Sequence, residues 1–134
     1  MELLHPRIEA HLPAFVAGSL HAYEDILGVF SGLITVRPAI QSPPLNTVVI
    51  TSERLLACDT HGSTHIIAAV RLLDVTKVST HEDAEQGYVS CFSELCDLHV
   101  SELRAEDAAF LQDVIYRAAA GVLFRVTAAE EAPF

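Results

Sequence analysis

Lysine is almost absent from this chain of 134 residues, in which Lys77 is the only one. Lysine and arginine together number 8 against 18 aspartates and glutamates, which gives a formal net charge of −10 at pH 7. Phosphate backbones and anionic lipid headgroups bind clusters of basic side chains, and here the arginines are scattered along the chain. We therefore predict no nucleic-acid partner and no strong binding to anionic membranes.

Long apolar runs and dense cysteines are also missing. No stretch approaches the ~20 apolar residues that a membrane-spanning helix needs, and residues 1–7 lack the basic segment and apolar core of a secretory signal. Three cysteines are an odd number at low density, unlike the framework of a small secreted domain. These absences predict a soluble, cytoplasmic protein with reduced thiols.

The common catalytic motifs are absent as well. The sequence contains no G-x-S-x-G elbow, no phosphate-cradling glycine loop and no H-E-x-x-H pair. Cys91 has no basic neighbour in the sequence to favour a thiolate. An enzyme is therefore the less favoured interpretation, and we expect no catalytic residue and no cofactor.

Short β-branched and apolar segments follow one another through most of the chain. Seven such segments, separated by turn residues, predict an antiparallel barrel or sandwich. The first is expected to bend at its glycines, and the Pro-rich segment 38–46 is expected to be a loop. The predicted strands are 24–37, 47–50, 55–58, 64–73, 75–80, 88–92 and 95–100.

Both ends of the chain show helical spacing. A broad apolar face from about Leu103 to Val126 predicts a long C-terminal helix, with acids near its start and arginines near its end. This helix is expected to cover the open end of the barrel. Leu4, Ile8, Leu12, Phe15 and Val16 predict one or two broken helical turns ending near Gly18.

Seven strands followed by a helix, together with three local patterns, resemble the pleckstrin-homology-like (PH-like) fold in its bacterial, YokE-like branch. The patterns are the strand–turn–strand segment 48–56 with Thr51 and Arg54 in its turn, the segment 72–78, and the apolar C-terminal helix. In the turn, the Thr51 hydroxyl is expected to bond local backbone amides, and the Arg54 stem to lie along the sheet. The predicted organisation is an N-terminal helical extension at 1–23, the PH-like domain at 24–126 and a tail at 127–134.

The resemblance does not extend to inositol-phosphate binding. Relatives that bind these ligands use basic residues around the first hairpin, whereas the loop at 38–44 has only the adjoining Arg37. Because one fold hosts many functions, the resemblance implies the fold without that lipid function.

Cysteine and histidine residues form one spacing that suits a metal. Cys58, His61 and His65 could place three ligands around a hairpin tip, and Cys91, Cys96 and His99 could form a second cluster. The simpler interpretation is a buried Cys58 and two histidines that solvate a turn. We therefore expect no metal site, and keep these residues as the alternative.

The hairpin near residue 94 makes a specific prediction about two cysteines. If Ser93 and Glu94 form a two-residue turn, Phe92 pairs with Leu95 and Cys91 faces Cys96 across the strands. The cytoplasmic setting favours thiols over a disulfide there.

The sequence favours a non-catalytic protein-interaction or self-assembly module. Segment 118–124 is apolar around the whole circumference of a helix, so Val122, Leu123 and Phe124 are predicted to mediate homo-oligomer contacts. Two coverings remain open, because the N-terminal apolar stripe could instead cover this surface within one chain. The alternative function is an uncharacterised enzyme or metal-binding protein that uses the cysteines and histidines.

Overall fold

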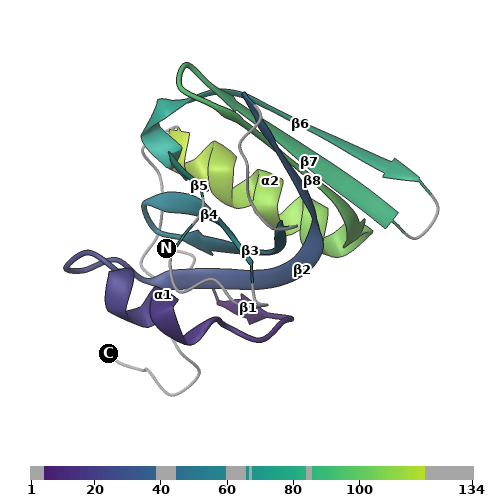
Figure 1. Cartoon of the computed structure of the whole chain (residues 1–134). Helices are drawn as coiled ribbons and strands as arrows, with labels where there is room; N and C mark the ends of the chain where they lie inside the picture. The colour runs from purple at the N-terminus through teal and green to yellow at the C-terminus, as the bar shows by residue number, and fades with distance from the viewer. Residues whose placement is uncertain (1–4, 39–44, 60–65, 67, 84–85, 120–134) are drawn as a thin grey trace.

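The computed structural model describes residues 5–38, 45–59, 66, 68–83 and 86–119 (Figure 1). In chain order the elements are β1 (Arg7–Ile8), α1 (Ala14–Ser19), β2 (Ile26–Arg37), β3 (Leu45–Thr51), β4 (Arg54–Cys58), β5 (Ala68–Arg71), the 3-10 turn η1 (Leu72–Asp74), β6 (Val75–Asp83), β7 (Gln86–Ser93), β8 (Asp97–Arg104) and α2 (Ala105–Ala119). Within these ranges, no helix is long and apolar enough to cross a membrane.

Strands β2 to β8 form one curled sheet in the order β5-β4-β3-β2-β8-β7-β6, and each neighbouring pair along this path is antiparallel. The predicted sheet of seven antiparallel strands followed by a helix is confirmed. The strand expected at 64–73 is shorter, because the chain leaves the sheet at Leu72. The Leu72 amide donates to the carbonyl of Glu53 at 2.8 Å, and its side chain is buried in η1.

Strand β2 belongs to both halves of the curled sheet. Its first part pairs with β3, its last part pairs with β8, and the register shifts between Ser31 and Ile34. Gly32 lies within this shift, where an added Cβ would stand 2.9 Å from the carbonyl oxygen of Ser101. The bend expected in this strand is therefore possible because Gly32 lets two backbones approach closely.

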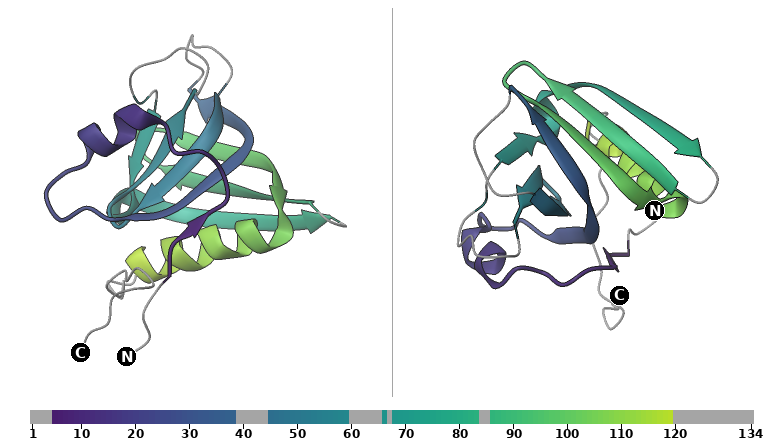
Figure 2. Two further views of the ribbon diagram at one scale, coloured as in Figure 1. Left: turned by 90° about the horizontal axis from the view of Figure 1, so that it is seen from below. Right: turned by 45° about the vertical axis from the view of Figure 1, so that its right-hand side comes forward.

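The main core fills the concave side of the sheet, and α2 covers it (Figure 2). Leu111, Val114 and Ile115 are buried on the inner face of α2, and Phe30 of β2 packs against Phe110 of α2 with ring centroids 5.9 Å apart. The predicted apolar face of the C-terminal helix is thus confirmed over its described part. The expected start is wrong by two residues, because Leu103 is buried in β8 and the helix begins at Ala105.

The N-terminal segment, residues 5–20, is not helical throughout. Only α1 is helical, and the segment before it forms the short parallel strand β1, with Arg7 beside Gly28 and Ile8 beside Val29. The expected helical position of Ile8 is wrong, since Ile8 lies in β1, where it is 55% exposed. Pro6 directly precedes β1 and Pro13 directly precedes α1, and both prolines lack the backbone amide that a continuous helix would use.

The N-terminal segment covers the outer face of β2–β4 within the same chain. Val16 is fully buried, and with Leu12 and Phe15 it packs into a second apolar cluster on the sheet side opposite α2. The sheet residues of that cluster are Val29, Val49, Leu56 and Cys58. The outer sheet surface over β2–β4 is therefore covered by the chain itself.

Candidate functional site

The turn between β3 and β4 is closed by Thr51. Its hydroxyl oxygen accepts hydrogen bonds from the backbone amides of Glu53 at 3.0 Å and Arg54 at 2.9 Å. The same hydroxyl donates to the Glu24 carboxylate at 2.5 Å. The local bonds confirm the role expected for Thr51, whereas Glu24 was not singled out from the sequence.

Arg54 does more than lie along the sheet. Its guanidinium donates from Nη2 to Glu24 Oε1 at 2.7 Å and from Nε to Oε2 at 2.9 Å, a bidentate pair. The Glu24 side chain is fully buried, and the backbone amide of His21 donates to it at 2.9 Å. Burial alone would raise the pKa of Glu24, but bonds from Arg54, Thr51 and the His21 amide outweigh it and lower that pKa to about 2.

His21, Glu24 and Glu53 bring three potential metal ligands within 4.8 Å of one another. His21 Nδ1 lies 2.9 Å from Glu53 Oε1, but both Glu24 oxygens already accept bonds from Arg54. A guanidinium in this position opposes a second cation. The cluster therefore connects the end of the N-terminal segment to the β3–β4 turn rather than forming an open metal site.

The buried cysteines lack the chemistry of nucleophiles. Burial raises the pKa of Cys58 to about 11, and burial with nearby Cys96 and Asp97 raises that of Cys91 to about 12. Both are neutral thiols at pH 7. His61 and His65 lie outside the described residues, so the Cys58–His61–His65 set stays a prediction.

The predicted pairing of Cys91 with Cys96 is wrong. Cys91 faces Leu98, and Phe92 faces Asp97, because Glu94 and Leu95 form the turn. Ser93 pairs with Cys96, its hydroxyl accepting from the Cys96 amide and donating to the Cys96 carbonyl. Cys91 belongs to the buried side of the sheet, whereas His99 pairs with Ser90 on the opposite side, so the second cysteine–histidine cluster does not assemble.

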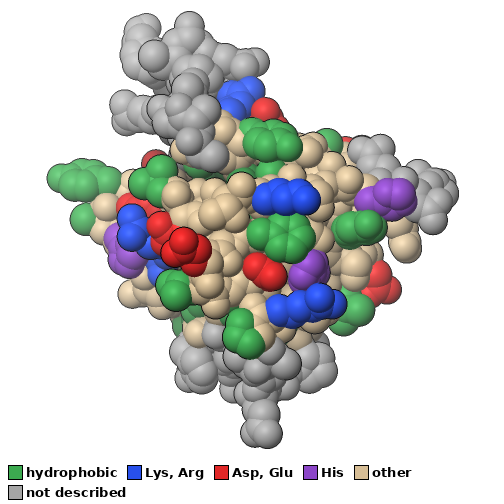
Figure 3. All heavy atoms as spheres, turned by 90° about the horizontal axis from the view of Figure 1, so that it is seen from above, with side chains coloured by type: hydrophobic (Ala, Val, Ile, Leu, Met, Phe, Trp, Pro, Cys, Tyr) green, Lys and Arg blue, Asp and Glu red, His purple; other side chains and the backbone are tan. Residues whose placement is uncertain are grey.

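One part of the outer sheet surface has no covering element among the described residues. It spans the end of β2 with β8, β7 and β6, and we call it the open sheet face (Figures 2 and 3). Strand pairing places its outward side chains in three rows across the strands. Two rows cross all four strands: Arg37, Asp97, Phe92 and Lys77; and Thr35, His99, Ser90 and Ser79. The third is interrupted by the register shift between β7 and β8, so that Leu33 pairs with Ser101 on one side of it and Tyr88 with His81 on the other.

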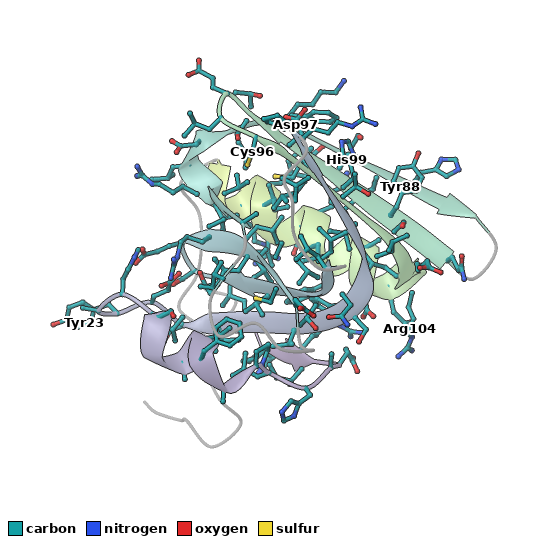
Figure 4. All side chains as sticks on the ribbon, in the orientation of Figure 1. Tyr23, Tyr88, Cys96, Asp97, His99 and Arg104 are labelled. Atoms are coloured by element: carbon teal, nitrogen blue, oxygen red, sulfur yellow. The ribbon has the colours of Figure 1, made fainter. Side chains whose placement is uncertain are left out.

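Aromatic and histidine side chains lie together on the open sheet face. The Phe92 and His99 rings meet edge to face with their centroids 5.6 Å apart, and the ring centroids of His81 and Tyr88 are 5.3 Å apart. Ser90 Oγ is 2.7 Å from His99 Nδ1, which fixes the imidazole. Asp97, His99 and Tyr88 all lie on the side of β7 and β8 away from α2 (Figure 4).

The two basic side chains on the open sheet face differ from the other basic side chains that the structure describes. Arg37 and Lys77 are both exposed, and neither has a described carboxylate within 4.0 Å. Lys77 Nζ instead lies 5.8 Å from the centre of the Phe92 ring. The other described arginines each pair with an acid: Arg7 with Asp107, Arg54 with Glu24, Arg71 with Asp74, Arg104 with Glu106 and Arg117 with Asp113.

Sequence reasoning did not identify the open sheet face. Its outward residues alternate with buried ones, as on any half-buried strand, and the rows appear only when four strands are aligned. The predicted self-association residues, Val122, Leu123 and Phe124, lie outside the described residues.

Comparisons with known proteins give structural similarity at low sequence identity. No family model and no curated protein matches the chain. The PH domain of USP37 is similar with a TM-score of 0.55 and 13% identity, covering 71% of this chain and 97% of that one. The Vps36 N-terminal PH domain gives a TM-score of 0.57 and 15% identity, covering 77% and 84%. The C-terminal domain of an unknown protein from Leishmania infantum is similar with a TM-score of 0.51 and 12% identity, covering 71% of this chain and 87% of that one. The curled seven-stranded sheet closed by α2 is therefore a PH-like fold.

Proposed function

We propose that this protein is a non-catalytic interaction module that binds a protein partner through the open sheet face. The observation that carries the proposal is an uncovered surface with two aromatic rings and two cations that have no carboxylate partner among the described residues. Aromatic and basic side chains are enriched at the energetic centres of protein interfaces. PH-like folds commonly serve as interaction modules, which supports the same function by analogy.

The enzyme alternative has less support among the described residues. A nucleophilic thiolate is disfavoured at Cys58 and Cys91, whose pKa values are raised by burial. The Glu24 carboxylate, which is buried against the β3–β4 turn, accepts hydrogen bonds on both oxygens and has its pKa lowered to about 2, so it is ionised at neutral pH. Neither arrangement suits proton transfer or nucleophilic attack near pH 7.

The partner can be mapped by affinity purification from the source organism with isotope-quantified mass spectrometry. Tyr88→Ser removes an exposed ring from the open sheet face, and Tyr116→Ser removes a similarly exposed ring from α2. A partner should be recovered with the wild type and Tyr116→Ser, and reduced at least about fivefold with Tyr88→Ser. Equal recovery of the partner with both variants would place the interaction on another surface of the protein. Failure to recover any specific partner would contradict the proposed function.

Self-assembly is the second part of the proposal and rests on the sequence of segment 118–124. We propose that the protein belongs to the bacterial, YokE-like branch of PH-like domains and acts in the cytoplasm as a homo-oligomer through Val122, Leu123 and Phe124. Support comes from the uniformly apolar composition of that segment.

Leu123→Asp is expected to shift the protein from oligomer to monomer, because a charge cannot be buried in an apolar contact without large cost. Size-exclusion chromatography with light scattering measures the mass. Ala109→Asp is the matched control, since Ala109 is exposed on α2. A wild-type protein that is monomeric at high concentration would exclude this mode of assembly.

A further inference from the structure

The two cations of the open sheet face lie at its two sides. In the first row, Arg37 on β2 and Lys77 on β6 are the outer members, and Asp97 and Phe92 stand between them. From this row we propose that the open sheet face binds an extended protein segment with two acidic side chains about four residues apart and an apolar side chain midway between them. The inference rests on the proposed function and gives it a class of partner.

The spacing follows from sheet geometry. Three strand-to-strand steps separate β2 from β6, and at ~4.8 Å a step the two backbones are ~14 Å apart. An extended segment advances ~3.3 Å per residue, so four residues cover ~13 Å. Residues i, i+2 and i+4 of such a segment point to the same side, which directs all three side chains to the sheet.

Charge selects what each position accepts. Arg37 and Lys77 favour carboxylates, since no described acid satisfies them. Asp97 lies between them and disfavours a third acid at the middle position by like-charge repulsion. The Phe92 ring, held by Lys77 on one side and His99 on the other, offers apolar contact there.

The surroundings of the open sheet face increase this selectivity. The chain carries a net charge of −10, so long-range repulsion disfavours polyanions such as nucleic acid or charged membranes. A short segment with two acids presents far less charge and can place both beside the two cations. The face therefore fits an acidic–apolar–acidic segment better than a densely charged surface.

The test uses the full-length chain and a short fluorescein-labelled peptide containing Glu-Ala-Leu-Ala-Glu in a neutral Gly/Ser context. Fluorescence anisotropy should show saturable binding, with at least about tenfold weaker binding of the Gln-Ala-Leu-Ala-Gln peptide. Lys77→Gln and Arg37→Gln should each weaken binding about threefold or more, as expected for exposed charge pairs. Arg71→Gln is the matched control, because it removes one exposed positive charge from β5.

Four outcomes would overturn the proposal. Equal weakening by all three substitutions would indicate nonspecific attraction, and equal binding of both peptides would remove the acidic requirement. Binding to phosphatidylserine vesicles that depends on Lys77 and Arg37, without peptide binding, would assign the face to a membrane. Loss of the cellular partner with Tyr88→Ser but no peptide binding would preserve the proposed function and reject only the acidic motif.

Discussion

Replacing Arg54 with alanine is expected to lower the free energy of unfolding by about 3 kcal/mol. The substitution leaves the Glu24 carboxylate fully buried without its bidentate partner, and breaking a buried ion pair from one side costs about 3–5 kcal/mol. Urea denaturation followed by circular dichroism measures the change as a lower midpoint with a similar slope. Thr51 and the His21 amide remain as donors, which places the expected value at the lower end of that range.

Two further variants separate the ion pair from general effects of losing an arginine. Arg71→Ala removes an exposed arginine whose partner Asp74 is 4.0 Å away, and should cost less than about 0.5 kcal/mol. Glu24→Gln in the Arg54→Ala background removes the uncompensated charge and should recover part of the loss. Equal destabilisation by Arg54→Ala and Arg71→Ala would contradict a structural role for the buried pair.

The same pair predicts how stability depends on acid. The pKa of Glu24 falls from its ordinary 4.5 to about 2 in the folded protein, so the unfolded chain binds this proton first as pH decreases. The contribution is therefore complete above about pH 5 and is lost as pH falls from 4.5 towards 2. A pKa shift of this size corresponds to a contribution of about 3 kcal/mol to the free energy of unfolding. In Glu24→Gln, this part of the acid dependence should disappear.

The sequence predicts best those features that depend on near neighbours. Residues 47–50 of β3 form a short β-branched run between turn residues, and the apolar spacing of α2 has one buried face, so strand and helix could both be inferred. Thr51 bonds amides only two and three residues away, which is also local. The prediction fails at the turn between β7 and β8. Because Ser93 is hydrogen-bonded to Cys96, the turn lies one residue later than expected, and every cross-strand partner changes.

Features that depend on distant segments could not be predicted in the same way. Glu24 meets Arg54 from 30 positions away, and neither residue carries a local sign of the pair. The spacing of Ile8 and Leu12 fits a helix, yet β1 is held by pairing with β2. The outer faces of the two half-sheets are both built from alternating strands, and only the path of the N-terminal segment decides which is covered.

Replacing Val16 with aspartate is expected to release the N-terminal segment from the sheet. Val16 is fully buried against Val29, Val49 and Leu56, and an unpaired carboxylate there would be strongly unfavourable. Undocking avoids that cost but loses the burial of Val16, worth about 1.5–3 kcal/mol. The Cys58 thiol in the same cluster should then become accessible, and its pKa should fall from about 11 towards 9.0.

Thiol labelling with dithionitrobenzoate, resolved by mass spectrometry of the modified cysteine, measures this release. Cys58 should react at least about tenfold faster in Val16→Asp than in the wild type, since each 1.4 kcal/mol of lost docking energy raises the open population tenfold. Ala17→Asp is the control, because it places the same charge on the exposed side of α1. Cys91, buried in the main core under α2, should stay protected in every variant. If Cys91 and Cys58 reacted at the same rate in Val16→Asp, the whole domain would be unfolding, and the N-terminal segment would be part of one cooperative unit.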